Sequence, residues 1–290
     1  MKPRELPPPV VPTPLLPWLL TALHPMNRTR VKELLRSGRV LVNGTSTTRH
    51  DHPLTPGDRV AIGAEPSLEA AALAKHGIAV LSEDAHYVAI DKPSGLLTVA
   101  TDGEKTATAF ALLHAHHRDR PFVVHRLDRD TSGVLLFAKS PGVRDRLQET
   151  WDSAEKTYLA AVDGVPGPPD GTVDNFLAEG KDLKVRAVRE SAEHAKRAVS
   201  RYRVVSRAGR LSLVEVRIET GRKHQIRVHL AGLGCPVIGD RLYGTGANPA
   251  GRLGLHARRL AFDHPATGER VTVAAAFPAG LQKLFPQADV

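Results

Sequence analysis

The chain has 290 residues, of which 41% are hydrophobic, so it can bury a substantial core in one large domain or two medium ones and is not a disordered chain. Forty Lys and Arg against 31 Asp and Glu give a formal net charge of +9, which favours a polyanionic partner because neutralised phosphates release condensed counterions. Cys235 is the single cysteine, which excludes an internal disulfide and a four-cysteine zinc site and predicts a reducing, cytoplasmic location.

At the N-terminus the sequence predicts an arm, a compact unit and a linker. Residues 1–14 are rich in proline and predict a flexible arm. Seven prolines between residues 7 and 25 interrupt a signal-peptide helix, and no other apolar run approaches the roughly 20 residues of a membrane helix, so no membrane association is expected. A small α/β unit is expected over residues 15–75, ending within the alanine-rich residues 63–80 that predict a linker.

The compact unit combines a short helix with a hairpin. Asn27 is a suitable cap for a helix that ends at Gly38, and Asn43-Gly44 predicts a tight turn between a strand over residues 40–42 and a closing strand at 60–62. The basic side chains on or beside the helix include Arg28, Arg30, Lys32, Arg36 and Arg39. This pattern resembles the RNA-binding domain first seen in ribosomal protein S-four, which implies that these side chains bind RNA. The alternative is an ordinary solvated helix face.

After residue 81 strands predominate, and several follow one another without an intervening helix. This order predicts an α+β domain over residues 82–290 with a mixed, largely antiparallel sheet. The expected strands are residues 87–90, 134–137, 158–162, 202–205, 211–218, 260–262 and 271–275. The expected helices are residues 106–117, 141–152, 223–233 and 281–285, with Thr220 as a possible cap of the third and with Lys223 and Arg227 on one face of it.

The most informative segment is His125-Arg126-Leu127-Asp128-Arg129-Asp130-Thr131-Ser132-Gly133, a charged loop that leads into an apolar strand. A carboxylate among arginines keeps a depressed pKa and stays ionised, so it can serve as a nucleophile. Composition alone leaves a surface loop of ion pairs as an equal alternative. The residue order, however, closely resembles the central motif of the RluA-type pseudouridine synthases.

Further segments are similar to motifs of the same family and follow in the same order. They are Asp91-Lys92-Pro93-Ser94-Gly95-Leu96, Lys156-Thr157-Tyr158, residues 220–229, residues 234–240 with Tyr243-Gly244, and Leu255-His256-Ala257 with Phe262, His264 and Pro265. The resemblance covers nearly all of residues 82–290 and implies isomerisation of specific uridines in structured RNA to pseudouridine. The N-terminal unit favours large-subunit ribosomal RNA as substrate, with transfer RNA as the alternative.

The resemblance also implies roles for individual side chains. Asp128 is the expected nucleophile, and whether it adds to the uracil ring or acts at the sugar stays open. Tyr158 is expected to stack on the target base, unless it is a core tyrosine. Arg227 is expected to pair bidentately with Asp128 and to keep it charged. Further contacts with substrate or RNA are expected from Arg126, Arg129, Arg222, His224, Gln225 and Ile226.

Arg126 has two interpretations, because it either holds the space that a flipped uridine leaves or contacts a phosphate, or else forms a surface ion pair with Asp130. No cofactor or metal is expected, since the His114-x-His116-His117 pattern lacks a matching second cluster. A monomer with RNA as its partner is expected. The competing function is that of a binding protein, such as a ribosome-assembly factor, that keeps the fold without the chemistry.

Overall fold

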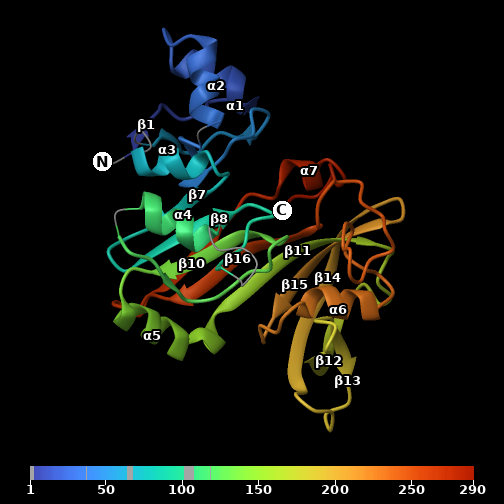
Figure 1. Cartoon of the computed structure of the whole chain (residues 1–290). Coiled ribbons are helices and arrows are strands. Elements are labelled where there is room, and N and C mark those ends of the chain that lie inside the picture. The colour runs from blue at the N-terminus through green and yellow to red at the C-terminus, as the bar shows by residue number, and fades with distance from the viewer. Residues whose placement is uncertain (1–2, 37, 64–67, 101–107, 118) are drawn as a thin grey trace. The chain divides into compact units, whose positions relative to one another are not determined.

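The computed structural model describes residues 3–36, 38–63, 68–100, 108–117 and 119–290 (Figure 1). The chain divides into two compact units, Met1–Ala71 and Ala72–Val290. None of the helices in the described ranges is long and apolar enough to cross a membrane.

The N-terminal unit packs two helices against a small sheet. Its elements are β1 (Arg4–Glu5), β2 (Thr13–Pro14), α1 (Leu15–Ala22), α2 (Arg28–Arg36), β3 (Val40–Val42), β4 (Thr45–Ser46), β5 (Pro53–Leu54) and β6 (Val60–Ile62). The strands β1-β6-β3-β4 form one sheet, and β2 pairs with β5. As expected, the Asn27 side chain accepts the Arg30 N–H at 2.9 Å at the start of α2. Asn43 and Gly44 have φ angles of 52° and 81° in the turn between β3 and β4.

Two predictions about the ends of this unit are wrong. The predicted free arm over residues 1–14 is wrong for its described part, residues 3–14, because β1 pairs with β6 and the N–H of the buried Leu6 donates to Val60 O at 2.9 Å. Prolines remove donors only at their own positions, so the residues before Pro7 still form an edge strand. The alanine-rich segment is not a bare linker, because it contains helix α3 (Leu68–Ala74) with Leu73 fully buried.

The larger unit is built on one extended sheet. Its strands are β7 (Ala79–Glu83), β8 (Tyr87–Lys92), β9 (Phe122–Val123), β10 (Ser132–Ala138), β11 (Glu155–Asp163), β12 (Asp170–Glu179), β13 (Val185–Val188), β14 (Lys196–Ala208), β15 (Leu211–Ile218), β16 (Leu255–Asp263) and β17 (Arg270–Ala274). The order is β13-β12-β14-β15-β11-β16-β10-β8-β7, with β17 on β16 and β9 on β10. β10 and β16 are parallel, whereas the other pairs are antiparallel. The predicted α+β class is confirmed.

Helices cover both faces of this sheet. They are α4 (Ala109–His116), α5 (Pro141–Glu149), α6 (Gln225–Gly232) and α7 (Ala279–Gln282), with a short 3-10 turn at Trp151–Ser153. Figure 1 shows α4 over β8 and β10, and α6 over β14 and β15. Tyr158 on β11 packs against both the cluster that contains α4 and the cluster that contains α6. The two helices therefore share one face, and Tyr158 lies between them.

The third predicted helix begins two residues later than expected. His224 has a left-handed φ of 55° and ends the preceding turn, so α6 starts at Gln225. Lys223 therefore lies outside the helix and forms an ion pair with Glu179, not a shared helical face with Arg227.

Candidate active site

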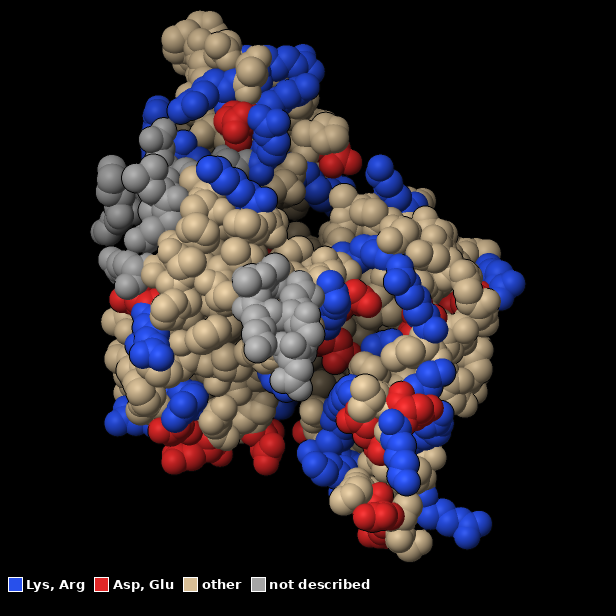
Figure 2. Space-filling model, in the orientation of Figure 1, with Lys and Arg blue, Asp and Glu red and all other residues tan. Residues whose placement is uncertain are grey.

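Asp128 lies on a turn immediately before β10, on the face that carries α4 and α6. The Leu127 N–H donates to Thr98 Oγ1 at 3.1 Å, and the Thr98 hydroxyl donates back to Leu127 O at 2.9 Å. Within the turn, the Thr131 N–H donates to Asp128 O at 3.2 Å. The Asp128 side chain stays 30% exposed, so a fixed main chain presents an accessible carboxylate. Figure 2 shows acidic and basic side chains together in the hollow at the middle of this unit.

Lys92, at the end of β8, supports the turn that carries Asp128 through hydrogen bonds to main-chain carbonyls. Its side chain is 0% exposed, and Nζ donates to Pro93 O at 3.0 Å, Leu96 O at 2.7 Å and Arg129 O at 3.0 Å. Burial lowers the pKa of Lys92 to about 7, while the charge of Asp128 opposes that shift. Three carbonyl acceptors need three N–H groups, so the ammonium is the form that satisfies this site. The sequence places Lys92 in a motif, but it does not reveal that the side chain fastens the Asp128 turn.

Gly133 closes the turn where β10 meets β16. Its φ is 114°, and a Cβ added there would lie 2.2 Å from the main-chain oxygen of Ala257. Both the left-handed conformation and this close approach require glycine. Strand β10, which begins two residues before the predicted strand at 134–137, therefore depends on glycine at its second position.

Gly133→Ala is expected to lower the free energy of unfolding by at least about 2 kcal/mol, since it combines backbone strain with a clash against main-chain atoms. Urea unfolding of the purified variant measures the change. Gly142→Ala is the matched control, because a Cβ at Gly142 in α5 meets nothing within 4 Å. Equal stability of the two variants would contradict the prediction.

Arg227 on α6 lies between two carboxylates. Its Nε and NH2 donate to Asp240 Oδ2 and Oδ1 at 2.7 and 2.8 Å, and its NH1 lies 3.7 Å from Asp128 Oδ2. The predicted bidentate pair with Asp128 is therefore wrong: the bidentate partner is Asp240, whose side chain is 0% exposed. Burial alone would raise the pKa of Asp240, but hydrogen bonds and charge from Arg227 hold it below its usual value. Arg227 faces Asp128 with its remaining nitrogen.

His224 and Tyr158 complete the surroundings of Asp128. His224 Nε2 lies 3.9 Å from Asp128 Oδ2, and its Nδ1 lies 2.9 Å from the hydroxyl of Tyr243. Burial lowers the pKa of His224, even though the nearby Asp128 carboxylate raises it. Burial and the Asp128 charge both raise the pKa of Tyr158 above its usual range, so its phenol stays neutral. The structure thus brings Asp128, Tyr158, Arg227 and His224 together.

Gln225 and Ile226, two residues of the predicted RNA-binding segment, are buried inside the protein. Gln225 Nε2 donates to Val199 O at 2.9 Å and to Ser200 Oγ at 3.0 Å, and its Oε1 accepts from the Thr220 hydroxyl at 2.7 Å. Thr220 therefore binds Gln225 and does not cap the helix with its own side chain. Gln225 and Ile226 are buried in protein, so they present no surface to RNA in this structure, and their contact with substrate or RNA stays a prediction.

The remaining predicted RNA contacts of this unit lie at the surface. Arg126 and Arg129 are exposed on either side of Asp128, although Arg129 Nε also donates to Gly95 O at 3.1 Å. Arg222 is exposed as well, with its Nε bonded to a main-chain carbonyl at 3.0 Å. Contact of these three side chains with RNA stays a prediction.

The basic helix of the N-terminal unit also presents its charges outward. Its exposed cations are Arg28, Arg30, Lys32 and Arg36, and Figure 2 shows Lys and Arg over this unit. Arg36 is ion-paired with Glu33. Arg39 differs from the others, because its Nε and NH2 both donate to Gly63 O at 3.1 Å and its side chain is half-buried. Arg39 therefore helps to hold the chain after β6 in place.

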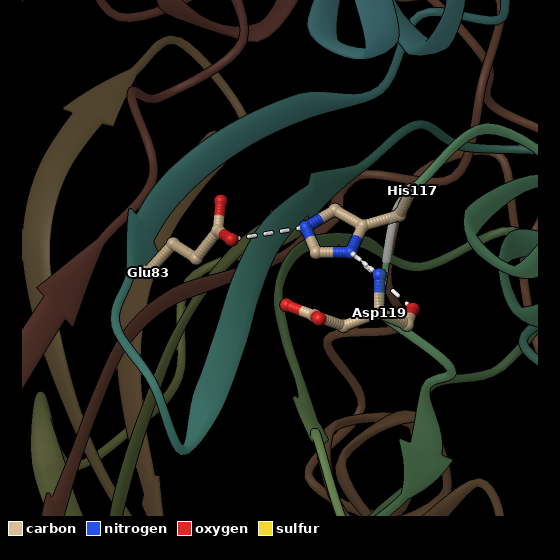
Figure 3. A group of neighbouring side chains, drawn as sticks. All are labelled: Glu83, His117 and Asp119. Carbon is tan, nitrogen blue, oxygen red and sulfur yellow. Dashed lines mark hydrogen bonds and ion pairs between the residues drawn. The ribbon is translucent and has the colours of Figure 1, made fainter.

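Among the residues that the structure describes, one group of side chains has spacing suited to a metal. Ligand atoms of Glu83, His117 and Asp119 lie within 4.8 Å of one another (Figure 3). The Asp119 N–H donates to His117 Nδ1 at 3.2 Å, which leaves the proton on Nε2 to bond Glu83 Oε1 at 3.1 Å. Lys139 Nζ lies 2.6 Å from Glu83 Oε1 and 2.9 Å from Asp119 Oδ2. An ammonium thus already binds both carboxylates, and the group forms an ion-pair network.

Comparison with known proteins agrees with the geometry of this site. Residues 86–232 match the RNA pseudouridylate synthase family. The chain is 34% identical over 280 residues to the uncharacterised RNA pseudouridine synthase YlyB of Bacillus subtilis, covering 92% of this chain and 91% of that protein. It is 35% identical over 293 residues to ribosomal large subunit pseudouridine synthase D of Xanthomonas campestris, covering 92% and 86%.

A solved human structure, RNA pseudouridylate synthase domain containing 4, shares the fold with a TM-score of 0.59 and 29% identity, over 73% of this chain and 93% of that one. The chain therefore belongs to the RNA pseudouridylate synthase family, of the RluA type. It is an RNA pseudouridine synthase, an isomerase that converts uridine in RNA to pseudouridine.

Proposed function

We propose that Asp128 is the nucleophile of this isomerase and that it acts on a uridine flipped out of structured RNA. The observation that carries the proposal is the convergence of Arg227 and His224 on the Oδ2 of an accessible Asp128, next to Tyr158. The reaction breaks the bond between ribose C1′ and uracil N1 and joins C1′ to uracil C5. C5 loses its proton and N1 gains one, so the product is an isomer of the substrate. An anionic carboxylate serves this reaction whether it adds to the ring or acts at the sugar.

The uridine has to flip out of the RNA so that its base can reach the Asp128 carboxylate. A base that is stacked inside an RNA helix cannot reach a carboxylate on the turn before a protein strand. The nucleotide therefore has to leave its stack. Tyr158 offers a flat, neutral ring on which the released uracil can stack while it turns, because stacking tolerates different base orientations. Arg126 is exposed beside Asp128 and is suited to hold the vacated space or a flanking phosphate.

Large-subunit ribosomal RNA is the substrate we favour, over transfer RNA. The N-terminal unit carries a row of exposed cations on α2, in a segment similar to the S-four RNA-binding domain. Such a row contributes sequence-independent affinity for a phosphate backbone. The relative from Xanthomonas campestris is named for the ribosomal large subunit, which supports the same choice.

Chemical mapping of pseudouridine across total RNA tests both parts of the proposal. Cells that lack this protein should lose one or a few pseudouridines in large-subunit ribosomal RNA. The wild-type chain should restore them, and Asp128→Asn should not. A site lost in transfer RNA would refute the proposed substrate, and restoration by Asp128→Asn would refute the nucleophile. Unchanged pseudouridine with impaired ribosome assembly would instead support the binding-protein function.

A further inference from the structure

Two N–H groups face the same oxygen of Asp128 without reaching it. Arg227 NH1 lies 3.7 Å from Asp128 Oδ2, and His224 Nε2 lies 3.9 Å from the same atom. Both separations exceed a hydrogen bond by about 1 Å, which is typical of catalytic contacts that tighten when substrate binds. The role of Arg227 follows from its permanent charge, whereas His224 can donate only if the proton lies on Nε2.

The backbone of His224 is held in an unusual conformation. Its φ is 55°, in the left-handed region, and its side chain makes no capping bond to the helix that begins at the next residue. Non-glycine residues in this region cluster where the surrounding structure requires a particular side-chain direction. Here that direction carries the ring between Asp128 and Tyr243, with 11% of the side chain exposed.

The contacts of Tyr243 favour one of the two neutral tautomers of the His224 ring. The Val185 N–H on β13 donates to the Tyr243 hydroxyl oxygen at 2.9 Å. The hydroxyl proton is then left to donate to His224 Nδ1, which also lies 2.9 Å away. With Nδ1 as acceptor, the neutral imidazole carries its proton on Nε2, the nitrogen that faces Asp128.

The surroundings keep this arrangement in place. Burial and the charges of Arg227 and Lys223 lower the pKa of His224, and the carboxylates of Asp128 and Asp240 raise it, with a net decrease that favours the neutral ring. Tyr243 packs against a cluster formed by β12, β13, β14 and α6. Its ring also lies under the Arg227 guanidinium, 5.1 Å from the ring centre. The position of the phenol is therefore set by the β12–β13 hairpin and by α6 together.

We infer that Tyr243 and His224 are positioning residues for the reaction: the Tyr243 hydroxyl fixes His224 in the Nε2–H form, and His224 becomes a second donor to Asp128 beside Arg227. The inference rests on the proposed role of Asp128 as nucleophile. It assigns a function to the β12–β13 hairpin, whose Val185 N–H orients the Tyr243 hydroxyl. If the hairpin moved away from α6, the Tyr243 hydroxyl would lose its orientation and the His224 ring could carry its proton on either nitrogen.

The state of the ring is measurable without any turnover. Nitrogen-15 NMR of ring-labelled histidine distinguishes the two neutral tautomers, and the signals of His224 are identified by their loss in His224→Gln. The full-length wild-type chain should show Nε2–H, and Tyr243→Phe should shift the population towards a mixture. Tyr202→Phe is the matched control, because its hydroxyl bonds only a main-chain oxygen, Pro168 O at 3.3 Å, among the contacts of the described residues.

Kinetics supply the second measurement. Tyr243→Phe should lower the single-turnover rate by roughly 10- to 100-fold, the usual effect of losing a group that orients an active-site ligand, with little change in KM. His224→Gln keeps an N–H at the distance of Nε2, so it should retain more activity than His224→Leu, which has no donor. Both substitutions place an equally unsuited side chain in the left-handed region, so their comparison isolates the donor.

Either of two results would overturn the inference about Tyr243 and His224. One is a Tyr243→Phe variant whose His224 tautomer and rate match those of Tyr202→Phe. The other is equal turnover by His224→Gln and His224→Leu, which decides the matter even if Tyr243→Phe fails to fold by circular dichroism. Normal turnover by Asp128→Asn would refute the proposed nucleophile instead, and it would leave the tautomer measurement unaffected, so the two failures are distinguishable.

Discussion

Asp128→Asn is expected to lower the single-turnover rate of pseudouridine formation by at least about 1,000-fold, because an amide of the same shape cannot act as the anionic nucleophile. The turn should keep its structure, since its hydrogen bonds to Thr98 and within the turn use main-chain atoms of residues 127, 128 and 131. RNA affinity should change little, because it depends on phosphate contacts made elsewhere. Excess enzyme with a labelled transcript measures the rate, and filter binding measures the affinity.

Asp130→Asn is the matched control for this experiment. It makes the same chemical change two residues further along the turn, where the side chain is exposed. Its turnover should remain close to that of the wild type. If Asp130→Asn lost activity as fully as Asp128→Asn, the effect would arise from the charge of the turn and not from one carboxylate.

Arg227→Met should have the second largest effect, on stability and on turnover together. Removing the guanidinium leaves the fully buried Asp240 carboxylate without its partner, which typically costs about 3–5 kcal/mol. The same change removes a donor that faces Asp128, so turnover should fall by roughly 100-fold or more. Urea unfolding and single-turnover kinetics on the same preparation measure the two effects.

The two consequences of Arg227→Met can be separated. In the double variant Arg227→Met with Asp240→Asn, the buried carboxylate at residue 240 is gone, so part of the stability should return while activity stays low. The stability deficit of the single variant should also shrink as the pH falls, because a protonated Asp240 leaves no charge unpaired. If activity returned together with stability in the double variant, Arg227 would serve the fold and not the reaction.

The position of the Asp128 turn could be predicted from the sequence, because the features that form it are contiguous. The charged residues, the glycine with positive φ and the buried strand follow one another within residues 125–138. The partner of Arg227 could not be predicted in the same way. Asp128 and Asp240 are distant from each other in sequence, and which of them becomes the bidentate partner of Arg227 depends on burial. The Asp240 side chain is 0% exposed and that of Asp128 is 30% exposed. Such a difference arises only from tertiary packing.

The elements that the sequence did not predict lack a strong apolar pattern. The β12–β13 hairpin exposes much of both strands, and its buried apolar contacts rest mainly on Leu177 and Val185. Helix α3 is rich in alanine, which favours a helix strongly but contributes little hydrophobic periodicity. Lys92 is a comparable case for the site, because a lysine at a strand end is usually solvated and only the folded chain shows three carbonyls around its ammonium.

The place of β16 in the sheet affects how the enzyme forms during translation. β10 follows the Asp128 turn and β11 carries Tyr158, yet the strand that joins them, β16 (residues 255–263), follows only after β12 to β15 and α6. A nascent chain that has released β10 and β11 would keep an unpaired edge on each until β16 leaves the ribosome. Asp128 and Tyr158 would then be held together only after residue 263 has left the ribosome, and a chain stalled before residue 255 would be both inactive and prone to aggregate.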